Sequence, residues 1–154
     1  MKPPSVLFVC LGNICRSPVA EAALRDAAAR AGVAVVVDSA GTGDWHVGHA
    51  PDPRSVATAA RHGIDISGYR GRQVRAEDFR RFDYVLALDP DNLRDLRGIA
   101  PGDASATVAL VMDYVPGRAG TGVDDPYYAE DAAFEVVWDE VAAAAKGLVA
   151  VLVR

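Results

Sequence analysis

The sequence predicts a single α/β domain in which helices cover a parallel sheet. Four short runs of mostly β-branched or aromatic residues have the continuous apolar character of strands buried on both faces. These runs alternate with longer segments of strong helix formers. No repeat, low-complexity segment or linker divides the 154 residues. We therefore expect one domain over residues 1–154.

The first strand is predicted over residues 6–9, an unbroken Val-Leu-Phe-Val run that ends at Cys10. A helix is predicted over residues 18–31, because proline suits the first helical position and the rest is rich in Ala, Leu, Arg and Glu. The hydroxyl of Ser17 is expected to cap this helix. The segment between them is therefore a loop from the carboxyl end of a strand to the amino end of a helix.

The remaining elements follow in order along the chain. Further buried strands are predicted over residues 33–37, 84–88 and 106–112. Helices are predicted over residues 53–62, 76–82 and 90–97, and a long amphipathic helix extends from Phe134 to Leu152. Asp89 directly precedes one of these helices, so we expect it to be an N-cap rather than a catalytic group.

Composition and charge exclude several classes of protein. The net charge of -5 and the pI near 5.1 argue against a partner such as nucleic acid or a membrane surface, which favours a basic face. No signal peptide and no apolar run of membrane-spanning length are expected. The two cysteines share one loop with polar residues, which indicates reactive thiols in a reducing cytoplasm rather than a structural disulfide.

The loop after the first strand combines an anion site with a nucleophile. Backbone N–H groups at a helix amino end attract an anion, and Gly12 and Asn13 allow the backbone to turn sharply. Cys10 at one end is expected to be largely thiolate, because the helix end and Arg16 both favour negative charge. The Arg16 guanidinium can bind two oxygens of a phosphoryl group. These residue types predict attack by sulfur on phosphorus.

The segment CLGNICRSP, residues 10–18, closely resembles the signature loop of the low-molecular-weight protein tyrosine phosphatases. The resemblance continues through DSAGT at 38–42, FDYVLALDPDNLRDL at 82–96 and DPY at 125–127, and covers essentially the whole chain. It implies a flavodoxin-like or Rossmann-like sheet with strand order 2-1-3-4. It also implies hydrolysis of aryl phosphate monoesters through a cysteinyl-phosphate, with no metal or organic cofactor.

The resemblance also implies roles for individual residues. Cys10 is the nucleophile, Arg16 stabilises the phosphoryl group and Asp125, directly before proline, is the general acid. The expected phosphate-binding residues are Leu11, Gly12, Asn13, Ile14, Cys15, Arg16 and Ser17, and the expected aromatic walls are Trp45, Tyr127 and Tyr128.

Several residues allow two interpretations. From the sequence alone, Trp45 either folds into the core or lines a cleft, and Ser39 either supports the loop or is an ordinary turn residue. His46 and His49 lack further ligands at suitable spacing, so we interpret them as surface residues rather than a metal site. Tyr69 stands where the family commonly has a supporting histidine, which puts that support in doubt. The arginines around it are typical of a solvated face.

Three other functions compete with phosphotyrosine hydrolysis. Arsenate reductase of the same fold needs a further cysteine downstream, and the chain has none after Cys15. Phosphoarginine phosphatases resemble this chain but typically have threonine where Ile14 stands. A non-catalytic phosphate-binding module would leave Cys10, Arg16 and Asp125 together unexplained. The expected partner is a phosphotyrosine-containing protein, the product is inorganic phosphate, and the protein is expected to be a monomer or at most a weak dimer.

Overall fold

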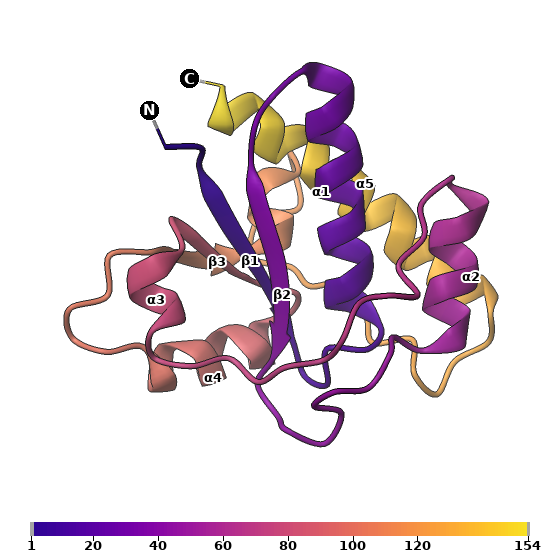
Figure 1. Ribbon diagram of the computed structural model, residues 1–154, viewed down its shortest axis with the longest axis horizontal. Coiled ribbons are helices and arrows are strands. Elements are labelled where there is room, and N and C mark those ends of the chain that lie inside the picture. Colours follow the sequence, from indigo (N-terminus) through magenta and orange to yellow (C-terminus); the bar gives the residue numbers. More distant parts are fainter. Residues whose placement is uncertain (1, 154) are drawn as a thin grey trace.

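The computed structural model describes residues 2–153 and contains one four-stranded parallel sheet. Its strands are β1 (Ser5–Cys10), β2 (Val36–Gly41), β3 (Tyr84–Ala87) and β4 (Thr107–Leu110), in the order β2-β1-β3-β4. This confirms the fold class and the strand order that the resemblance implied. The sheet lies at the centre of the molecule with β1 inside it (Figure 1).

Helices cover both faces of the sheet, because successive side chains of a strand point to opposite faces. Val6 and Phe8 of β1 pack in one core cluster, and Leu7 and Val9 pack in the other. The first cluster lies under α1 (Arg16–Ala31), α2 (Pro53–Arg61) and α5 (Ala132–Leu152), and the second under α3 (Asp78–Arg81) and α4 (Pro90–Ile99) (Figure 1). The helices cover the two faces of the sheet, so the carboxyl ends of the strands are covered only by the connecting loops.

All four strands differ from the predicted ranges by at least one residue at an end, and β2 and β4 differ most. β2 spans Val36–Gly41 instead of residues 33–37, because pairing with β1 continues to the bridge between Cys10 and Gly41. Gly41 has no side chain, and a Cβ there would lie 2.8 Å from the carbonyl oxygen of Leu11. β4 ends at Leu110, before the predicted 112, because residues 111–114 form a 3₁₀ turn. Pairing and turn geometry outweigh local strand propensity at both positions.

None of the helices within residues 2–153 combines the length and the apolar character needed to cross a lipid bilayer.

Candidate active site

The site lies where β1 passes into α1. Cys10 is the last residue of the strand and Arg16 is the first of the helix. The helix therefore begins two residues before the expected start, and Ser17 lies inside the first turn instead of capping it. The N-cap position falls on Cys15, whose side chain makes no capping hydrogen bond. The amides of the first turn have no side-chain partner there, which favours an anion beside the loop.

The Cys10 sulfur is surrounded by hydrogen-bond donors. Its Sγ lies 3.0 Å from Ser17 Oγ, and the backbone N–H of Asn13 donates to it at 3.3 Å. The side chain is almost completely buried. When Cys10 is a thiolate, the sulfur can accept from both of these groups, and a thiolate is the form that acts as a nucleophile.

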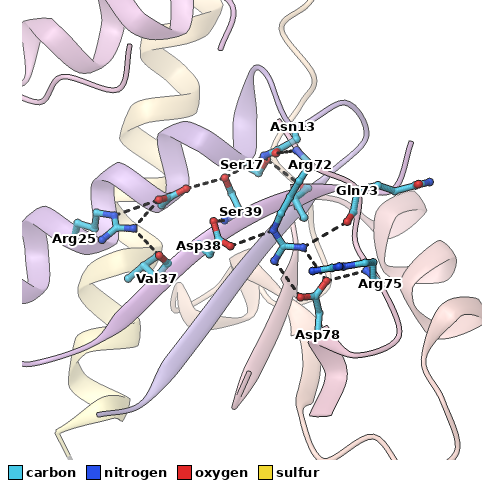
Figure 2. Close-up of polar contacts among 12 residues, drawn as sticks. Asn13, Ser17, Arg25, Val37, Asp38, Ser39, Arg72, Gln73, Arg75 and Asp78 are labelled. Carbon is cyan, nitrogen blue, oxygen red and sulfur yellow. Dashed lines mark hydrogen bonds and ion pairs between the residues drawn. The ribbon is translucent and has the colours of Figure 1, made fainter. Parts of the chain in front are cut away.

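Asn13 holds the loop from behind. Its backbone is left-handed with φ 59°, a conformation that asparagine tolerates and that no other non-glycine residue among 2–153 adopts. Its Nδ2 donates to Ser17 Oγ at 2.8 Å and to Ser39 Oγ at 3.0 Å, while Oδ1 accepts from the backbone N–H of Arg72 at 3.0 Å (Figure 2). These three bonds fix the amide. Because Ser17 Oγ accepts from Asn13, its own proton can be donated to Cys10 Sγ at 3.0 Å or to the carbonyl of Ala40 at 3.4 Å.

Ser39 extends this support to a buried carboxylate. It lies in β2 rather than in a turn, and its hydroxyl donates to Glu21 Oε1 at 2.8 Å. Glu21 forms an ion pair with Arg25 at 2.8 Å. Burial raises the pKa of Glu21, although the hydrogen bonds from Arg25 and Ser39 oppose the shift. Since Ser39 donates to Glu21, it accepts from Asn13, and the hydrogen bonds have one consistent direction.

Arg16 is held at the other end of the loop. Its Nη1 donates to Asp89 Oδ2 at 2.6 Å and to the carbonyl of Val123 at 3.0 Å, and its Nη2 lies 3.7 Å from Asp125 Oδ2. Burial lowers the pKa of Arg16, but the neighbouring Cys10 and Asp89 raise it by more than burial lowers it. The net effect is a raised pKa. Asp89 also caps α4, as predicted, and its second role as the partner of Arg16 was not predicted.

A cavity of about 240 Å³ lies over the loop. Trp45 is 65% exposed and stands at its edge, so this side chain lines a cleft instead of folding into the core. Asn13 and Ser17, expected among the phosphate-binding residues, are buried behind the cavity. The residues that line it are Cys10, Leu11, Gly12, Ile14, Cys15, Arg16, Trp45, His46, Asp125, Tyr127 and Tyr128.

Comparison with known proteins decides the family. A sequence model described as low molecular weight phosphotyrosine protein phosphatase matches residues 5–154. The chain belongs to this phosphatase family. It is 46% identical over 150 residues to a low molecular weight protein-tyrosine-phosphatase of Streptomyces coelicolor, an alignment that covers 94% of this chain and 91% of the relative. The phosphatase is therefore an enzyme of the hydrolase class.

Solved structures show the same fold. The crystal structure of YfkJ from Bacillus subtilis matches this phosphatase with a TM-score of 0.90 and 40% identity, over 98% of this chain and 95% of YfkJ. DARP, a Drosophila arginine phosphatase, matches with a TM-score of 0.87 and 31% identity, over 93% of this chain and 94% of its own. Relatives of this chain are thus named for tyrosine phosphatase and for arginine phosphatase activity, so the fold alone does not identify the substrate.

One feature of this phosphatase differs from the sequence interpretation. Arg72 is not part of a solvated face: its guanidinium binds both oxygens of the buried Asp78 at 3.0 Å and Asp38 at 3.1 Å, while its backbone N–H supports Asn13 (Figure 2). Tyr69 packs against the core near Glu21, and burial followed by that carboxylate raises its pKa. The loop is thus supported from the position three residues after Tyr69.

A side-chain pair that the sequence did not predict joins the phosphate loop to the loop of Asp125. Asp52 caps α2, and its backbone N–H donates to the carbonyl of Ile14 at 2.9 Å. The Asp52 carboxylate binds Arg54 through bonds of 2.9 to 3.0 Å. Arg54 then donates to the carbonyls of Tyr127 at 3.0 Å and Ala129 at 3.3 Å. The Asp-Pro N-cap pattern was visible in the sequence, but the distant partners of Arg54 were not.

His46 lines the cavity, and sequence reasoning missed it. The sequence interpretation places His46 on the surface, yet it lines the cavity and its Nδ1 lies 3.3 Å from Nδ1 of His49. Its position directly after Trp45 was the available signal. Within residues 2–153 no group of three or more metal-ligating side chains is found, so this pair has no third protein ligand.

Proposed function

We propose that this phosphatase hydrolyses phosphotyrosine in proteins through a cysteinyl-phosphate. One observation carries the proposal: Cys10, Arg16 and Asp125 face a single cavity whose outer walls include the aromatic rings of Trp45 and Tyr127. With the phosphate on the loop, a flat phenyl ring can lie between these walls. The shorter side chain of phosphoserine would not reach the loop from a protein surface.

In the first step, the Cys10 thiolate attacks phosphorus as the bond to the phenol oxygen breaks, and Asp125 gives that oxygen its proton. In the second step, the Asp125 carboxylate takes a proton from water, which attacks phosphorus and releases the sulfur and inorganic phosphate. Arg16 and the loop amides stabilise the equatorial oxygens in both steps. Because Asp89 and Val123 already hold Arg16, little rearrangement is needed.

The proposed reaction needs no metal or organic cofactor, because the nucleophile, the acid and the charged stabiliser all come from the chain. A single protomer supplies every one of these groups, which supports a monomer or at most a weak dimer. The protein substrate carries phosphotyrosine, and the acidic chain suits neither nucleic acid nor a membrane surface as partner. Two free cysteines in one loop favour the cytoplasm.

The identity of the phosphoryl donor is tested by parallel assays on matched phosphotyrosine and phosphoarginine peptides, with a chelator present. Ile14 gives the cavity an apolar wall, so we expect kcat/KM to favour phosphotyrosine by about tenfold or more, the scale of one altered contact in an apolar pocket. Ile14→Thr should reduce that ratio. Preference for phosphoarginine, or complete loss of activity with the chelator, would contradict the proposal.

We also propose that peroxide inactivates this phosphatase reversibly. Peroxide converts the Cys10 thiolate to a sulfenic acid, and the Cys15 thiol displaces water from it to form a disulfide, which two equivalents of an added thiol reduce again. Burial, then Asp52 and Cys10, raises the pKa of Cys15 to about 12, so Cys15 is a thiol at neutral pH. Its capture of the sulfenic acid should therefore become faster as the pH rises.

The redox proposal is checked by peroxide treatment followed by dithiothreitol. Wild type should recover most of its activity, whereas Cys15→Ser should start near normal activity and recover poorly as Cys10 proceeds to sulfinic acid. Inorganic phosphate should protect both proteins by occupying the loop. Equal recovery of the two proteins would mean that Cys15 only packs behind the loop.

A further inference from the structure

A second hollow lies beside the catalytic cavity and shares two of its walls. Leu11 and Trp45 line the cavity over the phosphate loop and also line a shallow groove of about 440 Å³. Ile99, at the end of α4, supplies a third apolar side chain to the groove. These three residues are 43%, 65% and 37% exposed. Exposed apolar side chains that gather in one place are typical of a binding surface.

Two glycines shape this groove. A Cβ at Gly43 would lie within 1.9 Å of the Trp45 indole, so the missing side chain lets the ring rest directly on the backbone. The Trp45 ring thus packs on the Gly43 backbone and separates the cavity from the groove. On α4, a Cβ at Gly98 would meet nothing within 4 Å, so this end of the groove is open.

The charges of the groove do not favour a charged occupant. Arg94 is its one cation, and its guanidinium lies 3.3 Å from Asp91 and 3.8 Å from Asp95. Two carboxylates already compensate this charge, so an acidic side chain would gain little from it. The exposed apolar surface of Leu11, Trp45 and Ile99 remains the main feature available to a ligand.

We propose that the groove binds an apolar side chain of the substrate polypeptide close to the phosphotyrosine. The inference rests on the proposed function: Leu11 and Trp45 line both hollows, so a substrate polypeptide with its phosphotyrosine in the cavity can cross this shared rim into the groove. Each residue of an extended peptide advances by about 3.3 Å, so a neighbour within a few positions reaches the far side of one indole ring. A flanking Leu or Ile would cover the apolar walls there.

The test compares kcat/KM for phosphotyrosine peptides that carry Leu, Gly or Asp at each of the three positions on either side. Wild type should prefer Leu over Gly by about threefold to tenfold at one position, a partial burial of one side chain. Ile99→Ser removes an apolar wall and Gly98→Gln fills the open end, so both should bring that ratio near one. Val136→Ser, at another exposed apolar residue, is the matched control and should keep the preference.

Free phosphotyrosine has no flanking residues and separates the two proposals. Wild type and the three variants should hydrolyse free phosphotyrosine at equal rates. If wild type does not hydrolyse free phosphotyrosine at all, the proposed function is overturned, and not the groove proposal alone. The groove proposal is overturned if wild type shows no preference at any position, if it prefers Asp, or if the preference for Leu survives both groove variants.

Discussion

Cys10→Ser is expected to lower kcat/KM for phosphotyrosine peptides by at least roughly a thousandfold, the scale at which loss of a nucleophile acts. The two donors around Sγ, Ser17 Oγ and the N–H of Asn13, stabilise a thiolate, but a serine hydroxyl is not ionised at neutral pH. Steady-state assays on the purified variant measure the effect.

The matched control for this substitution is Cys15→Ser, five residues along the same loop. Because Cys15 is protonated at neutral pH, its variant should keep near-normal activity before any oxidation. The Cys10 variant should still bind inorganic phosphate, since Arg16 and the loop amides remain, and calorimetry checks this. Substantial turnover by Cys10→Ser would remove the cysteinyl-phosphate from the mechanism.

Asp125→Asn should slow phosphotyrosine hydrolysis by roughly a hundredfold or more, because an amide cannot protonate the departing phenol oxygen. The Asp125 side chain is partly exposed, with Oδ2 3.7 Å from Arg16 Nη2 and Oδ1 accepting from the backbone N–H of Tyr127 at 3.1 Å. Asparagine retains the second contact, so the loop geometry should survive. The loss should shrink for substrates whose leaving group needs no proton.

Asp124→Asn is the control for the neighbouring carboxylate, which does not line the cavity. We expect it to change kcat by less than the Asp125 variant for every leaving group. If Asp124→Asn lowers kcat more than Asp125→Asn does, then Asp124 is the general acid and the assignment to Asp125 is wrong.

The sequence was sufficient for the elements whose signals are local. The apolar run before Cys10, the Ser-Pro after the loop and the Asp-Pro N-cap at Asp89 each depend on neighbouring residues, and the structure has a strand or helix at all of these places. Strand order came from resemblance. The observed strand boundaries differ from the predicted ones where pairing with a neighbouring strand determines them. In β2, the polar residues Asp38 and Ser39 belong to the strand because they pair with β1.

Contacts between segments that are far apart along the chain could not be predicted from the sequence. Arg72 resembled a solvated charge, and only the fold brings it to Asp38 and Asp78. Arg54 likewise gave no sign of reaching a loop more than 70 residues away, at the carbonyls of Tyr127 and Ala129. Side chains of this kind carry no periodicity and form no motif, so their partners become visible only when the tertiary structure is known.

The contacts that hold Arg16 link the catalytic site to the folding of distant parts of the chain. Its contacts with Asp89 and Val123 join residues 73 and 107 positions apart. A long stretch of chain must close before such non-local contacts are gained. A folding intermediate with only β1, the loop and α1 in place would have the Cys10 thiol but a guanidinium that is not yet held. Catalytic activity thus depends on completion of the whole chain topology rather than on the local unit that bears the nucleophile.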